Sequence, residues 1–394
     1  CCGVIMTMED IRIEGKAGRI GNELTSVVVD GPKNKEYRRP YMEEIDKAAK
    51  AGEHWGHVYE ALPWGRPSEP LPKKEALGIR VPLYGFDEWG KLFTERQLLA
   101  LGVIVKTTRE AAAALRELGY PEEATDALLS YLAIAVDRLV DRSSTICTWD
   151  QGYTKVNHTF HRYALPITWD FCEGNPLSDT TGNYYSAVEW VSKYVSHALQ
   201  CTEVAPTPSV LCTSATQKTS FESFDLVFTD PPYYDAIPYS DLMDFFYVWL
   251  RRSTQGMSIE VDDAFATELG PKWDDDKQDG ELIDDSSRFH GDRANSKKAY
   301  EDGMYKAFRA CNDALRRDGK CVVVFANKQP DAWETLVSAL IRAGFVADGS
   351  WPIATEMSTG LRNVGRASLA SSVWLVCKKR PEAARPGWDN NVLE

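Results

Sequence analysis

The sequence has 394 residues, of which 43% are hydrophobic, and its formal net charge is -13. This length is enough for two or three domains with a sizeable core. The sequence has no run of about 18 apolar residues, which is the length that a membrane-spanning helix needs. The negative charge is unlike that of a general nucleic-acid binder, although a local basic face would be sufficient to bind phosphate. Nine scattered cysteines and the absence of a visible signal peptide predict a reducing, cytoplasmic setting rather than a disulfide framework.

Residues 1–85 are predicted to form a small domain followed by a linker. Apolar and polar residues alternate over residues 9–31, which predicts short strands. Residues 63–85 are rich in proline and glycine, as is typical of a linker. The chain opens with Cys1 and Cys2. Two cysteines alone cannot complete the four ligands of a structural zinc site, so a pair of free thiols is the alternative.

Residues 86–205 are predicted to be a helical region. Thr94 and Gln97 form a capping box ahead of apolar residues at helical spacing, which predicts a helix that begins there. A second helix over about Glu122–Arg142 would complete a helical hairpin. A third helix is expected near Tyr184–Gln200.

Two histidine pairs have the spacing of metal ligands. His54 and His57 lie in the first domain, and His158 and His161 lie in the helical region. No partner cysteines lie near the first pair. Polar contacts within loops are the favoured interpretation of both pairs.

Residues 206–394 alternate strand-like and helix-like segments, which predicts an α/β domain with a doubly wound sheet. Ser209–Cys212 is expected to be one strand, and the apolar run Phe224–Thr229 a central strand buried on both faces. Lys320–Lys328 is a second buried-strand pattern that ends in polar residues, and Ser372–Cys377 is expected to close the sheet.

The strand Phe224–Thr229 ends abruptly at Asp230, Pro231, Pro232 and Tyr233. Proline lacks a donor N–H and has a fixed φ, so the chain must leave the sheet at Pro231. Asp230 is therefore expected at the carboxyl end of a strand, where open α/β sheets bind their ligands. An acid and a proline carbonyl can accept the two hydrogens of an exocyclic amino group, and the tyrosine offers a flat face to an aromatic ring. The alternative is a strand that simply ends in a Pro-Pro turn with surface tyrosines.

The segment Asp230-Pro231-Pro232-Tyr233 resembles the Asp-Pro-Pro-Tyr motif of amino-methyltransferases. Those enzymes transfer a methyl group from S-adenosylmethionine to the exocyclic nitrogen of a flipped adenine or cytosine. The continuation of the motif to Arg252 resembles the large adenine-specific DNA methylases that carry an embedded zinc ribbon, and the resemblance covers roughly residues 1 to 380. It implies an incomplete Rossmann-like S-adenosylmethionine methyltransferase sheet with a helical insert. It also implies a small N-terminal zinc-ribbon remnant at Cys1 and Cys2, with zinc in the full-length protein.

The resemblance assigns the chemistry to four residues. Tyr233 is expected to stack on the flipped base, while Asp230 and the carbonyl of Pro231 bind its amino hydrogens and Pro232 stiffens the turn. Asp at the first motif position implies adenine rather than cytosine. Ser214 stands in a loop that faces the adenosine end of the cofactor in the family, which commonly has an acid there, so this position departs from the family pattern.

Further residues are candidates for contacts with double-stranded DNA. Asn327 and Lys328, at the tip of a strand, would line the base pocket, with a strand-end cap as the alternative for this pair. Tyr234 follows the motif directly and is a candidate for the same surface. Arg362 and Arg366 lie in a glycine-containing loop and are candidate phosphate contacts.

One family feature is missing from the sequence. Amino-methyltransferases have a glycine loop of the Phe-x-Gly-x-Gly type, which lets the backbone approach the methionine part of the cofactor, and no such loop occurs in these residues. The resemblance therefore implies the carboxyl-terminal part of a longer enzyme, which needs an N-terminal segment to hold S-adenosylmethionine tightly. The missing N-terminal segment and a restriction or phage-defence protein are the candidate protein partners. The alternatives are an N4-cytosine DNA methyltransferase, a methyltransferase of RNA or protein glutamine, and a non-catalytic DNA-binding or scaffold fragment.

Overall fold

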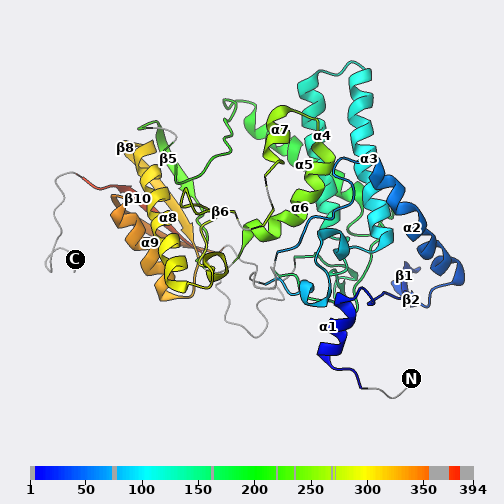
Figure 1. The fold of residues 1–394 in the computed structure, drawn as a ribbon. Coiled ribbons are helices and arrows are strands. Elements are labelled where there is room, and N and C mark those ends of the chain that lie inside the picture. Colours follow the sequence, from blue (N-terminus) through cyan, green and yellow to red (C-terminus); the bar gives the residue numbers. More distant parts are fainter. Residues whose placement is uncertain are drawn as a thin grey trace. The chain divides into compact units, whose positions relative to one another are not determined.

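The structure is a computed structural model that describes residues 5–72, 78–160, 164–218, 221–234, 237–267, 269–270, 272–354 and 372–381 (Figure 1). The chain divides into two compact units. The first consists of Cys1–Pro208 with Tyr239–Pro271, and the second of Ser209–Pro238 with Lys272–Glu394. Within the described residues, no helix is both long and apolar enough to cross a membrane.

The first unit is mainly helical, with two short antiparallel strand pairs and two 3-10 helices between its helices. Its helices are α1 (Met8–Lys16), α2 (Met42–Glu60), α3 (Glu95–Glu117), α4 (Glu122–Val140), α5 (Tyr184–Thr202), α6 (Tyr239–Thr254) and α7 (Ile259–Ala264). Its strands and 3-10 helices are β1 (Val27–Asp30), β2 (Lys35–Arg38), η1 (Val81–Tyr84), η2 (Trp89–Leu92), β3 (Trp149–Asp150) and β4 (Lys155–Val156).

The strand prediction for residues 9–31 was wrong at its start, where α1 forms instead. Thr7 caps this helix: its hydroxyl accepts the N–H of Asp10 at 3.2 Å, and the Asp10 carboxylate accepts the N–H of Thr7 at 2.8 Å. A reciprocal capping box of this kind satisfies two N–H groups that a helix otherwise leaves unpaired. This local chemistry outweighs the alternating pattern there, whereas β1 does form and pairs antiparallel with β2.

The predicted helical hairpin is confirmed. The N–H of Thr94 donates to the Gln97 side-chain oxygen at 2.9 Å, and the Gln97 N–H donates to the Thr94 hydroxyl at 3.3 Å. Helix α3 begins at Glu95, directly after Thr94, and α4 packs along α3. The aromatic side chains of α6 complete this core, because Phe245 and Trp249 are fully buried and both contact Phe93, with ring centroids 5.7 Å and 5.3 Å away.

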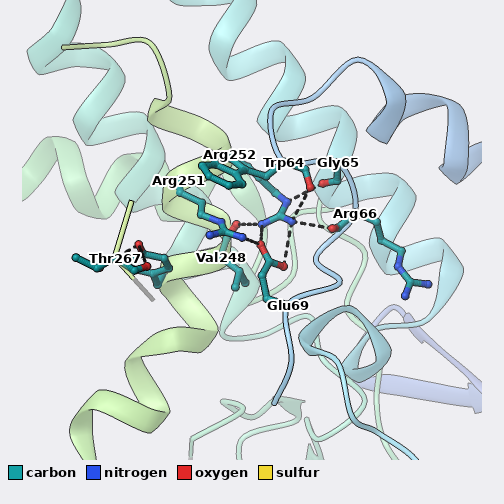
Figure 2. A network of polar contacts seen from close by, with 9 residues as sticks. Trp64, Gly65, Arg66, Glu69, Val248, Arg251, Arg252 and Thr267 are labelled. Atoms are coloured by element: carbon teal, nitrogen blue, oxygen red, sulfur yellow. Dashed lines mark hydrogen bonds and ion pairs between the residues drawn. The ribbon is translucent and has the colours of Figure 1, made fainter. Parts of the chain in front are cut away.

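A buried ionic network connects α6 to the segment before η1. Arg252 is fully buried, and its guanidinium donates to both carboxylate oxygens of Glu69, at 2.6 Å and 3.0 Å. Arg251 donates to the same carboxylate. Figure 2 shows that the remaining Arg252 donors reach main-chain carbonyls, which belong to Trp64, Gly65, Arg66 and Val248. This single guanidinium thus fixes the path of a segment that has no regular secondary structure.

Asp137 on α4 predicts a pH dependence of stability. Its Oδ1 atom is buried without a hydrogen-bond partner among the described residues, and burial raises the pKa of this carboxyl well above its ordinary value. In the unfolded chain the Asp137 carboxyl ionises near pH 4, whereas in the folded chain it stays protonated. The free energy of unfolding is therefore highest below pH 4 and falls by about 1.4 kcal/mol per pH unit above it. The loss ends at the folded pKa.

We expect Asp137→Asn to remove this dependence, because the amide has the same shape and does not ionise. The gain in melting temperature of the variant over the parent should be small at pH 4 and grow toward pH 7, as measured by circular dichroism. Parallel curves for the two proteins would contradict the assignment.

Four of the described strands in the second unit form a mixed sheet. The strands are β5 (Phe224–Thr229), β8 (Leu315–Phe325), β10 (Ser372–Lys379) and β9 (Phe345–Ile353), in the order β5-β8-β10-β9. β5 is parallel to β8, and the other two pairs are antiparallel. The remaining elements are the hairpin β6 (Trp273–Asp274) and β7 (Asp279–Gly280), the 3-10 helix η3 (Ser286–Phe289), and helices α8 (Arg293–Ala314) and α9 (Pro330–Arg342).

Two expectations for this sheet were wrong. Ser209–Cys212 has no strand structure, and Val210 and Leu211 are 90% and 72% exposed, so no packing supports a strand there. β5 is an edge strand of the described sheet and not its centre, since its one pairing is with β8. The chain is therefore a mixed α/β protein with parallel and antiparallel strands.

Helices α8 and α9 pack together against one face of the sheet (Figure 1). Val323 and Phe325 of β8 are fully buried against Tyr300 and Phe308 of α8 and Leu336 of α9. Successive strand residues point to opposite faces. On the other face, Leu226 and Phe228 of β5 are 55% and 54% exposed. A doubly wound sheet has helices on both faces, whereas α8 and α9 cover one face, so they do not form the arrangement that the sequence predicted.

Candidate functional site

The motif Asp230 to Tyr233 lies at the carboxyl end of β5, as predicted. Thr229 pairs with Val323 in the parallel register, and β8 ends two residues later at Phe325. The segments that follow both strands therefore leave the sheet at the same edge. In open α/β sheets this edge is the usual place for a ligand.

Asp230 and Tyr233 are directly hydrogen bonded. The Tyr233 hydroxyl donates to the Asp230 Oδ1 at 2.7 Å, and the Tyr233 ring lies edge-on to the buried ring of Phe325, with centroids 5.4 Å apart. Asp230 is exposed and has no ion pair with any other described residue. Its carboxylate keeps further acceptor positions, because each carboxylate has about four lone-pair sites.

The two proline carbonyls of the motif have different surroundings. The Pro232 carbonyl accepts the Tyr300 hydroxyl at 2.8 Å and the Tyr234 N–H at 3.1 Å. No donor among the described residues contacts the carbonyl of Pro231, although the Pro231 side chain is buried. The turn is thus held through Pro232, whereas no described donor occupies the Pro231 carbonyl.

Tyr234 belongs to the core of this unit. It is 9% exposed, and its ring packs edge-on to Tyr300 at 5.3 Å. Its carbonyl accepts the N–H of Asp284 at 3.0 Å, and its N–H also lies 3.2 Å from the Tyr300 hydroxyl. With φ at 60° it adopts the left-handed conformation, which is costly for a bulky residue and persists because these contacts hold it.

Sequence reasoning missed Tyr300 as a residue of the site. Its hydroxyl holds both the Pro232 carbonyl and the Tyr234 N–H, so α8 directly positions the motif. The repeat of Tyr300, Met304 and Phe308 at four-residue spacing indicates a core-facing helix stripe. That pattern contains no information about where the hydroxyl points.

Ser214 is held by the β6–β7 hairpin. Its hydroxyl donates to the Asp279 carboxylate at 2.9 Å, and the Thr216 hydroxyl donates to the same oxygen at 3.0 Å. A carboxylate therefore accompanies the serine, but it comes from a residue 65 positions later in the chain. No motif around Ser214 predicts this pairing.

Asn327 forms the strand-end cap that was the alternative to a base contact. Its side-chain oxygen accepts the N–H of Gln329 at 2.9 Å, and its carbonyl accepts the indole N–H of Trp333 at 2.9 Å. These bonds guide the chain from β8 into α9. Lys328 next to it is exposed.

The remaining candidate residues include several that the structure does not describe. Cys1, Cys2, Arg362 and Arg366 lie outside the described residues. Within the part of the chain that is described, no group of three or more His, Cys, Asp or Glu side chains is placed to hold a metal ion. His158 makes polar contacts, with Asp141 and with Arg142, whose guanidinium is 2.7 Å from its Nε2.

Comparison with known proteins found no match to any family model and none to a curated protein.

Proposed function

We propose that the chain contains the catalytic half of a DNA methyltransferase that methylates the exocyclic N6 amino group of a flipped adenine. The observation that carries the proposal is the pair of open acceptors at the end of β5. The Asp230 carboxylate and the Pro231 carbonyl are adjacent, and no described donor uses the carbonyl. An exocyclic amino group has two hydrogens to donate, which fits two neighbouring acceptors.

The residues of the motif have distinct tasks in this proposal. A base must leave the duplex stack before its amino group can react, and the ring of Tyr233 offers the flipped base a stacking surface. Asp230 and the Pro231 carbonyl accept the two amino hydrogens and orient the nitrogen lone pair. This arrangement acts through positioning and electrostatic stabilisation. Tyr300 contributes indirectly, because its hydroxyl fixes the Pro232 carbonyl.

The residues present fit the target amine better than they fit the whole cofactor. S-adenosylmethionine supplies a methyl group on a positively charged sulfonium, and the exposed Asp230 carboxylate suits that charge. The sequence has no Phe-x-Gly-x-Gly loop, and β5 has one paired edge in the described sheet. Exposed Leu226 and Phe228 on this strand are consistent with a Rossmann-like sheet that is incomplete here. Our proposal therefore includes a cofactor site completed by further residues of the full-length protein.

Ser214 and Asp279 support a place for the cofactor near the hairpin. The family commonly has an acid at the position of Ser214, and here the Asp279 carboxylate is hydrogen bonded to that serine. A carboxylate can accept hydrogen bonds from ribose hydroxyls. In the proposed enzyme, Asp279 takes the place of the missing acid.

The test is product analysis with the protein expressed from its complete gene. Duplex DNA free of methylated bases is incubated with S-adenosylmethionine that has an isotope-labelled methyl group, then digested to nucleosides and analysed by mass spectrometry. We expect labelled N6-methyladenine. Labelled N4-methylcytosine would instead support the cytosine enzyme, and DNA binding without any labelled base would support the scaffold alternative.

A further inference from the structure

A cavity of about 250 Å³ lies in the first unit, between α4 and the start of α5. One wall is formed by Arg138 in the last turn of α4 and by Arg142, which lies two residues beyond the end of this helix. The other wall is the segment from Asp179 to Asn183 with the first turns of α5, including Trp190. One water occupies about 30 Å³, so the cavity has room for a small polyatomic ion with several waters.

The guanidinium of Arg142 is held by a main-chain carbonyl and a histidine ring, and not by a carboxylate. It donates to the Val156 carbonyl at 2.6 Å and lies 2.7 Å from Nε2 of His158. The Asp141 carboxylate accepts the Nδ1–H of His158, whose Nε2 accepts from Arg142. Burial lowers the pKa of Arg142 from its ordinary value, against the opposing effect of Asp141. An arginine remains charged at neutral pH, so a further anion beside it would be stabilised.

Arg138 is oriented by a ring. Its guanidinium lies over the indole of Trp190, 4.8 Å from the centroid, and none of the described residues forms an ion pair with it. Stacking holds the guanidinium plane while leaving its N–H edge available. Two guanidinium groups with fixed planes on one wall are suited to an oxyanion, which they can bind through paired hydrogen bonds.

The opposite wall adds hydroxyl groups and fits closely. Thr180, Thr181 and Ser186 line the cavity. Gly182 has φ at 94°, and a Cβ at this position would lie 2.7 Å from Cδ of Arg142. The loop thus approaches the arginine as closely as a residue without a side chain allows. Asp179, which is exposed, is the one acid in the lining and opposes two arginines.

We propose that this cavity binds a phosphate group, either as a free phosphate or as the phosphodiester of a nucleic-acid backbone. The two arginines supply charge and directed donors, and the Thr181 hydroxyl of the loop supplies a further donor. The proposal is independent of the motif at Asp230, which lies in the other unit. Loss of methyl transfer would leave it untouched, and loss of phosphate binding would leave the methyltransferase proposal untouched.

The experiment compares Arg138→Gln with Arg39→Gln in the whole chain. Both substitutions remove one exposed arginine charge from the first unit, but Arg39 lies outside the cavity. Binding of inorganic phosphate is measured by calorimetry, and binding of a short duplex oligonucleotide by fluorescence anisotropy over a range of salt concentrations. A third variant, Gly182→Ala, keeps every charge but moves the loop against Arg142. Circular dichroism confirms that each variant is folded.

We expect Arg138→Gln to weaken binding about tenfold, Gly182→Ala to weaken it as well, and Arg39→Gln to leave it unchanged. An effect on inorganic phosphate identifies a free phosphate site. An effect on the oligonucleotide alone, with the salt slope reduced by about one, identifies a backbone contact. The proposal is overturned if neither ligand binds, or if Arg138→Gln and Arg39→Gln have equal effects.

Discussion

Replacing Asp230 by alanine is expected to abolish methyl transfer to adenine while leaving the fold intact. The carboxylate is exposed, and among the described residues its one side-chain bond is to the Tyr233 hydroxyl, so little stability depends on it. In the proposed reaction the Asp230 carboxylate accepts a hydrogen bond from the amino group as positive charge develops on the nitrogen. Removing one such preorganised partner typically lowers turnover by about 10²–10³-fold. Transfer of labelled methyl groups by the full-length protein measures the loss.

Tyr233 provides two informative controls for that result. Tyr233→Phe removes the hydroxyl that binds Asp230 but keeps the ring, so base stacking should survive and turnover should change much less than in Asp230→Ala. Tyr233→Ala removes the ring and should weaken binding of the base by about 1–3 kcal/mol. Unchanged turnover in Asp230→Ala, with the parent active, would refute the role of the carboxylate. Equal losses in Asp230→Ala and Tyr233→Phe would show that the hydroxyl rather than the acid is essential.

The elements predicted best from the sequence are those whose determinants are close together along the chain. The capping box of Thr94 and Gln97 predicts the start of α3 to the residue. The apolar run ended by two prolines predicts both β5 and the position of Asp230 at its end. In each case a few neighbouring residues are enough to decide where a backbone donor is satisfied or lost.

Predictions failed where two patterns compete or where the partner is distant. The alternation around Ile11 and Ile13 reads as strand, but the Thr7 cap decides for α1. Asp318 and Gly319 are typical of a turn, yet they lie within β8, which follows α8 without a loop. Strand pairing across the sheet decides this segment, and that pairing has no local signal.

In the candidate site, too, the local features were predictable from the sequence and the distant contacts were not. The acceptors of the motif are visible in the sequence, whereas the groups that hold them are not. Tyr300 reaches the Pro232 carbonyl from 68 residues away, and Asp279 reaches Ser214 from 65 residues away. A single sequence indicates which side chains suit a chemistry. It does not indicate which distant hydroxyl or carboxylate fixes their geometry.

Glu69→Ala is expected to destabilise the first unit strongly. The substitution leaves two guanidinium groups, on Arg251 and the fully buried Arg252, without their shared carboxylate. Breaking a buried ion pair from one side typically costs about 3–5 kcal/mol, because the remaining charge is uncompensated. Glu88→Ala is the matched control, since it removes the carboxylate of a more exposed pair with Arg66, where about 0–1 kcal/mol is expected.

Native-state hydrogen exchange measures this effect with an internal reference. Amides of α6 in the first unit should exchange faster in Glu69→Ala, by the factor that corresponds to the lost free energy, whereas amides of β8 in the second unit should be unchanged. Adding Arg252→Met to Glu69→Leu should not recover the loss, because the four main-chain carbonyls that accept from Arg252 would then lose their donor. Equal exchange of α6 amides in Glu69→Ala and Glu88→Ala would show that the carboxylate does not hold α6. In that case the carbonyls around Arg252 would be sufficient to satisfy its charge.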